Sequence, residues 1–107
     1  MGYTSYMIIK QTETFEKWLD GLRDRQVQLR IGARILRLVE GNPGDHKVLS
    51  GGITEMRIDY GPGYRLYYTQ KGSEIILLLV GGDKRSQKRD IETAKKLASE
   101  LKGDYDD

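Results

Sequence analysis

Two arginines flank a Gly-Pro-Gly turn signal in the stretch EMRIDYGPGYRLYY, residues 55–68. Each follows the alternating pattern of a β-strand, so the stretch predicts a hairpin that carries Arg57 on one strand and Arg65 on the other. Guanidinium groups bind phosphate oxygens through paired hydrogen bonds. Arg57 and Arg65 could therefore hold a phosphate-bearing ligand.

A second cationic segment, GGDKR, follows the apolar run IILLLV at residues 75–80 and supplies Lys84 and Arg85. In an antiparallel meander the end of this strand lies near the start of the hairpin. We therefore expect three or four cations, together with the carboxylate of Glu55, at one rim of the sheet. The paired glycines of this segment would let a ligand or another backbone approach closely.

Strand alternation sorts the hairpin into two faces. With residues 61–63 as the loop, Asp59 would lie opposite Arg65 and Arg57 opposite Tyr67. One face would pack against helices and holds Met56, Ile58, Tyr60, Tyr64, Leu66 and Tyr68. The other would be open to solvent and holds Glu55, Arg57, Asp59, Arg65, Tyr67 and Thr69. The alternative is an ordinary solvated sheet face, where a pair such as Asp59–Arg65 contributes at most about 1 kcal/mol.

Helical patterns precede and follow the hairpin. Apolar spacing predicts a helix over residues 12–22, capped by Thr12 or Thr14, and a longer one that begins after Asp24 and ends at the GNPG segment. A closing helix is predicted over residues 86–102, with Ser86 as its cap.

Strands are predicted at residues 5–11, 55–60, 64–69 and 74–80. The fold class is therefore α+β, in the order β-α-α-β-β-β-α, with an antiparallel sheet and the helices packed on one face. The 107 residues, 1–107, form one domain.

Composition narrows the classes of function. The chain has no cysteine and one histidine, which removes thiolate and histidine-based metal sites and suits a reducing cytoplasm. The longest apolar run is too short to cross a bilayer. Residues 1–99 hold 17 basic and 12 acidic side chains, net +5, whereas residues 100–107 carry net −3. A basic body with an acidic tail is compatible with a polyanionic partner and equally with a solvated charged surface.

Further residues are candidates for contact with RNA or for proton transfer. Lys47, Arg85 and Lys88 could contact phosphates, and Tyr67 could stack on a base or simply pack across the strands. His46 is the one imidazole and could act as an acid or a base near neutral pH, or be an exposed loop residue.

Two segments taken together, RILRLVEGNPGDHKVLSGGITEMRIDYGPGYRLYY and LLLVGGDKRSQKRDIETAKKLA, resemble the RelE/ParE superfamily of bacterial toxins. Within it the chain is most similar to the HigB-like addiction module killer branch, which is related to phage-derived proteins. The resemblance covers nearly the whole chain and implies the RelE-like fold.

The resemblance implies one of two activities. Many members are ribosome-dependent mRNA interferases, in which an RNA 2′-hydroxyl attacks the adjacent phosphate without a metal or another cofactor. Other members inhibit DNA gyrase by binding alone, and an inactive relative is a third possibility. By resemblance to the nuclease members, Arg65 of this chain would hold the scissile phosphate. Arg57 and Lys84 match two further positions at which those members carry basic residues.

Proton transfer would fall to neighbouring residues. Glu55 is the best available base, and Lys84 could assist the leaving group. Near the start of the final helix, where several members carry tyrosine or histidine, this chain offers Gln87 and Asp90. The implied partners are a helix-turn-helix antitoxin of the HigA type, in a hetero-oligomeric complex, and the ribosome with its mRNA. No membrane partner is expected.

Overall fold

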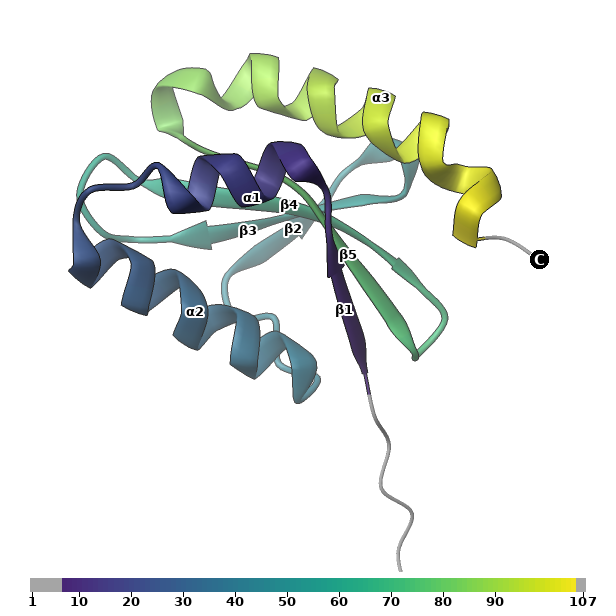
Figure 1. Ribbon diagram of the computed structural model, residues 1–107, viewed down its shortest axis with the longest axis horizontal. Helices are drawn as coiled ribbons and strands as arrows, with labels where there is room; N and C mark the ends of the chain where they lie inside the picture. Colours follow the sequence, from purple (N-terminus) through teal and green to yellow (C-terminus); the bar gives the residue numbers. More distant parts are fainter. Residues whose placement is uncertain (1–6, 106–107) are drawn as a thin grey trace, which may run out of the picture.

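A computed structural model describes residues 7–105 of the chain, with side chains through Leu101. Within this range the helices are α1 (Glu13–Asp20), α2 (Arg25–Val39) and α3 (Gln87–Tyr105). The strands are β1 (Ile8–Gln11), β2 (His46–Val48), β3 (Ile53–Ile58), β4 (Tyr64–Lys71) and β5 (Ile75–Asp83). Short 3-10 turns precede β3 and α3. The architecture is α+β, as the sequence predicts (Figure 1).

The strands form one sheet in the order β1-β5-β4-β3-β2. Three neighbouring pairs are antiparallel, but β1 pairs parallel to β5, so the sheet is mixed rather than purely antiparallel. The short edge strand β2 falls where the sequence predicts a loop. Of the first predicted strand, residues 5 and 6 lie outside the described residues.

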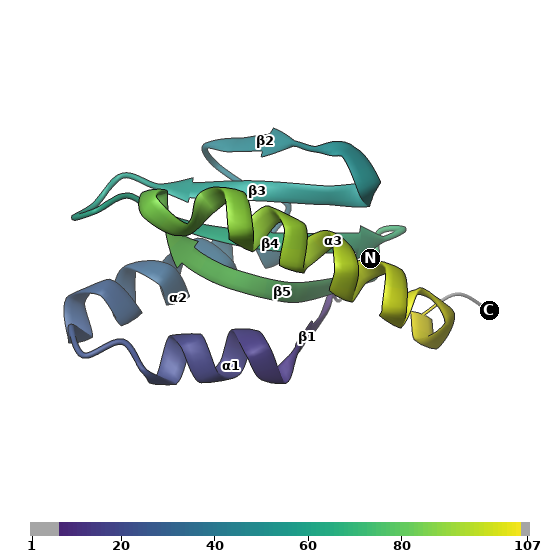
Figure 2. The ribbon, with the colours of Figure 1, turned by 90° about the horizontal axis from the view of Figure 1, so that it is seen from above.

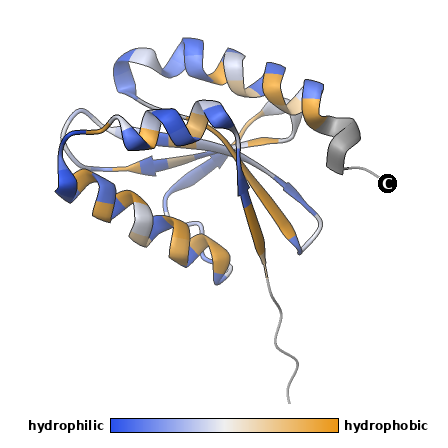
Figure 3. Ribbon diagram, viewed as in Figure 1, coloured by the Kyte–Doolittle hydropathy of each residue, from blue (hydrophilic) through white to orange (hydrophobic). Residues whose placement is uncertain are grey.

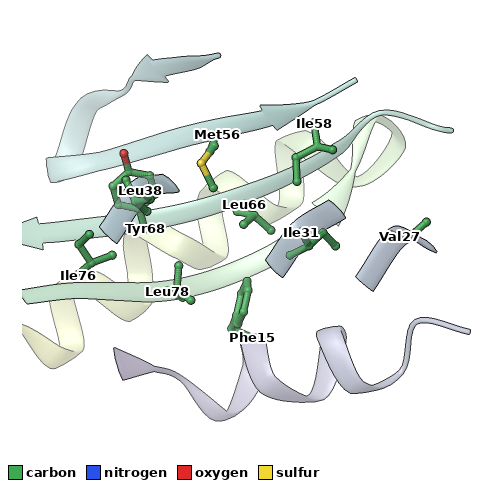
Figure 4. Close-up of a cluster of buried hydrophobic side chains, with 10 residues drawn as sticks. All are labelled: Phe15, Val27, Ile31, Leu38, Met56, Ile58, Leu66, Tyr68, Ile76 and Leu78. Carbon is green, nitrogen blue, oxygen red and sulfur yellow. The ribbon is translucent and has the colours of Figure 1, made fainter. Parts of the chain in front are cut away.

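Two apolar layers cover the sheet, one on each face. Figure 4 shows the first layer, where Phe15 of α1 and Ile31 of α2 meet alternate side chains of the strands, such as Met56 and Leu66. The second layer joins α3 to the opposite face through Ala94 and its neighbours. Its buried members are Ile53, Tyr67, Leu77, Leu79, Val80 and Ala94.

The expectation that all helices pack on one face is therefore wrong. Figure 2 shows α3 crossing the strands while α1 lies to the side of them. The β5 side chains explain both layers, since Ile76 and Leu78 belong to the first cluster and Leu77 and Leu79 to the second. A strand that is apolar on both sides needs a cover on both sides.

Helices α1 and α2 begin directly after the cap residues that the sequence predicts. Thr12 accepts a hydrogen bond from the backbone N–H of Phe15 and caps α1, and Asp24 accepts one from Gln26 and caps α2. Before α3, Asp83 caps the 3-10 turn Lys84–Ser86. Its side chain accepts from the backbone N–H groups of Arg85 and Ser86, which starts a 3-10 turn that leads into the helix.

Candidate functional site

An open cleft of about 390 Å³ lies at the end of the β3–β4 hairpin, beside the turn that leads into α3. Arg57, Arg65 and Lys84 all line it, so the three principal predicted cations converge. The remaining lining residues are Asp45, Ile58, Asp59, Gly61, Pro62, Gly63 and Tyr64.

The hairpin register sets the two arginines directly opposite one another. The observed pairs are Arg57 with Arg65 and Ile58 with Tyr64, so the loop spans residues 59–63 and not 61–63. Within the loop, the backbone N–H of Tyr60 donates to Ile58 and that of Gly63 donates to Tyr60. The predicted pairs of Asp59 with Arg65 and Arg57 with Tyr67 are therefore wrong. The shift is an even number of residues, so the predicted sorting into two faces is retained.

Two like charges directly opposite one another repel, and Glu55 compensates for this. Its Oε1 accepts a hydrogen bond from Nε of Arg57 at 2.9 Å, and its Oε2 lies 3.8 Å from Nε of Arg65. One carboxylate thus holds both guanidinium groups beside the cleft.

Glu55 is itself fully buried. Its Oε2 accepts hydrogen bonds from the hydroxyl of Tyr67 at 3.0 Å and from the side-chain amide of Gln87 at 2.9 Å. Burial alone would raise the pKa of Glu55, but the hydrogen bonds from Gln87, Arg57 and Tyr67 outweigh it and hold the pKa below its ordinary value. A carboxylate of this kind stays ionised and enclosed, which does not suit the predicted role of general base.

Arg65 is the most enclosed of the three cations. Its side chain is 14% exposed, and Nη1 donates to the carbonyl oxygen of Gly63 at 2.9 Å. Its Nε is buried and makes no hydrogen bond within the described part of the chain. The side chain is thus held from two sides, by the loop carbonyl and by the charge of Glu55.

Lys84 and Arg85 follow β5 but differ in their surroundings. A Cβ added at Gly63 would lie 3.7 Å from Cβ of Lys84, which places the lysine stem against the hairpin loop. Arg85 does not line the cleft, and it pairs with Asp83 at 3.1 Å with a side chain that is 85% exposed.

The glycines before Lys84 accommodate the protein's own side chains rather than a ligand. A Cβ at Gly81 would overlap the ring of Trp18 from α1, and one at Gly82 would overlap the carboxylate of Asp90 from α3. Asp90 is buried and accepts a hydrogen bond from the Ser86 hydroxyl. It lies under the first turn of α3 and outside the cleft lining.

The other predicted residues are not brought into the cleft. Tyr67 is fully buried, so of its two predicted roles the structure contradicts stacking on a base and agrees with packing within the sheet. Burial and the Glu55 carboxylate raise the pKa of its hydroxyl, which makes Tyr67 a neutral donor. His46 pairs with Met56 and so projects toward the sheet face that carries α1 and α2. Lys47 and Lys88 are exposed and do not line the cleft.

The sequence does not assign Asp45, Asp59 or Arg34 a role at the site. Asp45 and Asp59 place carboxylates at the cleft, and Arg34 of α2 supports the backbone beside it without lining it. Arg34 donates to the carbonyl oxygens of Arg57 at 2.6 Å, Pro43 at 3.0 Å and Asp45 at 3.2 Å. Asp59 follows directly from its place in the hairpin loop, whereas nothing in the helical pattern separates Arg34 from the exposed arginines.

The described residues contain neither a cluster of metal-ligating side chains nor a membrane-spanning helix. Within them, no group of three or more His, Cys, Asp or Glu side chains is arranged to hold a metal ion. None of the described helices combines the length and the apolar character needed to cross a membrane.

Comparison with known proteins agrees with this architecture. A curated protein of Haemophilus influenzae, itself uncharacterized, is 48% identical over 93 residues, covering 87% of this chain and 94% of that protein. Among solved structures, a double arginine-to-alanine variant of the E. coli toxin RelE in the free state superposes with a TM-score of 0.68 at 16% identity, covering 87% of this chain and 98% of that one. The intact E. coli RelBE toxin–antitoxin complex matches with a TM-score of 0.57 at 17% identity, covering 74% and 96% of the two chains.

These likenesses confirm the resemblance to the RelE/ParE superfamily at the level of the fold. The family model described as "Phage derived protein Gp49-like (DUF891)" matches residues 17–101, most of the chain. The chain therefore belongs to the Gp49-like family of phage-derived proteins and has the fold of the RelE toxin.

Proposed function

We propose that this protein is the toxin of a type II toxin–antitoxin system and an endoribonuclease that cleaves mRNA at the ribosome, in the cytoplasm. The observation that carries the proposal is the convergence of Arg57, Arg65 and Lys84 on one cleft. A cleft lined by three cations attracts and orients a phosphodiester. The RelE-like fold and the family membership add support.

The reaction would be attack of an RNA 2′-hydroxyl on the adjacent phosphorus, with loss of the 5′-oxygen of the next nucleotide. Negative charge on the phosphoryl oxygens increases toward the transition state. Cations already held in place stabilise that state more than the ground state. Glu55 fixes Arg57 and Arg65 before RNA arrives, so little reorganisation is required. This chemistry draws its positive charge from side chains and calls for no metal ion.

Proton transfer is assigned to groups that reach the cleft. We assign protonation of the leaving oxygen to Lys84, which is exposed there. The base for the 2′-hydroxyl would be an accessible carboxylate, and Asp45 and Asp59 line the cleft whereas Glu55 is enclosed. Each such proton transfer typically contributes 10²–10⁴-fold.

Toxin function implies a neutralising partner. The structural neighbour RelBE is a toxin–antitoxin complex, which supports an antitoxin for this chain as well. Following the HigB-like resemblance, we propose a helix-turn-helix antitoxin of the HigA type that forms a hetero-oligomeric complex with the toxin.

The test is a transcriptome-wide map of mRNA 5′ ends, taken minutes after the protein is induced without its antitoxin. Cuts phased to the reading frame are expected with the wild type. They should be lost with Arg65→Ala and strongly reduced with Lys84→Ala. Lys96→Ala, an exposed lysine of α3 outside the cleft, is the matched control and should cut normally.

Folding must be checked because Arg65 is largely enclosed. Thermal melting of each variant shows whether a lost activity reflects a lost fold, and Lys84→Ala gives a second test at an exposed position. Growth arrest with intact mRNA and DNA damage would contradict the nuclease and indicate gyrase as the target. Undiminished cutting by both cleft variants would refute the roles assigned to these cations.

A further inference from the structure

Helix α2 carries apolar side chains on two opposite faces. Val27, Ile31 and Leu38 are buried against the sheet, as expected of a surface helix. On the outward face Leu29 and Leu36 are 56% and 66% exposed. Gly32 and Ala33 lie between them at the three- and four-residue spacing that aligns side chains along a helix. These four residues, Leu29, Gly32, Ala33 and Leu36, form the outer stripe of α2.

The outer stripe departs from the usual design of a surface helix, whose outward face is polar. In Figure 3 hydrophobic colour covers much of α2. A Cβ added at Gly32 would meet no atom within 4 Å, so the surface between the two leucines is open. The two exposed leucines, with the small residues Gly32 and Ala33 between them, form a shallow apolar surface on which another helix could pack.

The charge along this helix has a single sign. Residues 25–39 contain four arginines and no acid. Arg30 and Arg37 follow Leu29 and Leu36 by one position, so they share one flank of the stripe, and Arg25 lies at its N-terminal end. In residues 7–101 neither Arg25 nor Arg37 forms an ion pair with a carboxylate. Arg30 stacks over the Tyr60 ring at 4.1 Å, close to the hairpin loop.

We propose that the outer stripe of α2 is a docking surface for an amphipathic helix of a partner protein, one with leucine-like residues on its contact face and acidic residues along one flank. Apolar anchors would insert between Leu29 and Leu36, and carboxylates would pair with Arg30 and Arg37. A second copy of this chain is the wrong occupant, because two α2 helices would bring arginines together with no carboxylate from either helix. This surface is separate from the cleft, and the inference holds whether or not the protein cleaves RNA.

The test uses two synthetic helical peptides of about 20 residues with the same leucine spacing, one flanked by glutamates and the other by lysines. Fluorescence anisotropy against the full-length protein should show the glutamate peptide binding about tenfold tighter or more than the lysine peptide. The double variant Leu29→Ser and Leu36→Ser should weaken binding of the glutamate peptide about tenfold or more. Because both leucines are exposed, the fold should be retained.

Matched controls separate this surface from others. Val48→Ser changes an apolar residue of β2 that is 73% exposed and should bind the peptide like the wild type. Lys84→Ala should also bind normally, so a failure of the nuclease proposal would leave this result intact. Arg37→Glu should reduce the preference for the glutamate peptide over the lysine peptide.

Three results would overturn the proposal. One is the same affinity for both peptides, or no binding of either. Another is a dimer in sedimentation experiments that the double serine variant abolishes, which would make a second copy the occupant. The last is an RNA oligonucleotide that competes for the stripe and loses affinity in the double serine variant, which would make α2 a nucleic-acid surface.

Discussion

Glu55 illustrates how surroundings decide the role of a carboxylate. A general base needs a pKa near the operating pH and access to the proton that it removes. Glu55 has neither, because it is fully buried and accepts hydrogen bonds from Arg57, Tyr67 and Gln87. Its negative charge instead offsets the repulsion between the paired arginines. The residue that looks most like a catalytic base in the sequence is, in the structure, the carboxylate that holds Arg57 and Arg65 in place.

The variant Glu55→Gln should be less stable than the wild type at neutral pH by about 3 kcal/mol, because it leaves the enclosed Arg65 without its counter-charge. Folding lowers the pKa of Glu55 from 4.5, so the unfolded chain takes up this proton first as the pH falls. The stability that the carboxylate contributes is therefore present above about pH 4.5 and declines below it. Urea denaturation of both proteins from pH 7 to pH 3 measures this, and the difference between them should shrink in acid.

The exposed Glu74→Gln is the matched control and should follow the wild type at every pH. A difference between Glu55→Gln and the wild type that stays constant down to pH 3 would show that the carboxylate charge is not what Arg65 requires.

At the scale of elements, features set by neighbouring residues are predicted from the sequence more accurately than contacts between distant segments. Thr12 and Asp24 cap their helices as predicted because a cap is decided by neighbours within one turn. The sorting of the hairpin side chains into two faces is also predicted correctly, although α3 covers the second face, which the sequence predicts to be open. The register of the hairpin was not predicted correctly, because a glycine-rich loop can close at more than one length.

The second apolar layer, between α3 and the sheet, was not predicted, although the sequence contains a pattern that indicates it. The run IILLLV is apolar at successive positions, which implies cover on both faces of β5. The alternation of β3 and β4 on its own predicts that one face of the sheet is open to solvent, but α3 covers that face. The same helix delivers Gln87 to Glu55, so the error about the layer is also why Tyr67 was expected to be exposed. The pairing of β1 with β5 joins distant segments and has no local signature.

The close approach of α1 to β5 gives a test at this scale. Gly81→Ala should destabilise the protein by about 1–3 kcal/mol, because the added methyl group overlaps the Trp18 ring and the packed helix must shift. Trp18 is the one tryptophan of the chain, so its fluorescence reports the shift directly. Gly32→Ala is the matched control, since its methyl group meets nothing within 4 Å. It should stabilise the protein by up to about 1 kcal/mol through helix propensity. Equal stability of both variants would mean that α1 does not pack on β5 as described.

Over the whole molecule, the cleft and the outer stripe of α2 are neighbouring surfaces. Arg34 of α2 holds the backbone of Arg57 and Asp45 at the cleft, and Arg30 lies over Tyr60 beside the hairpin loop. A helix docked along α2 would end close to the loop that shapes the cleft.

The concentration of charge at one rim predicts how the protein should respond to salt. A single strand of RNA that places phosphates on Arg57, Arg65 and Lys84 releases counterions from about three sites, so log K should fall against log salt with a slope of about −2. The body of the protein carries net charge of only +5 over residues 1–99, so a much steeper slope would require contacts outside the cleft. Titration of a 2′-O-methyl RNA oligonucleotide, which cannot be cleaved, measures the slope. Lys84→Ala should make it shallower by about 0.7, whereas Lys96→Ala should leave it unchanged. If both variants reduced the slope equally, RNA would be bound non-specifically along α3. That result would contradict the assignment of the cleft as the phosphate site.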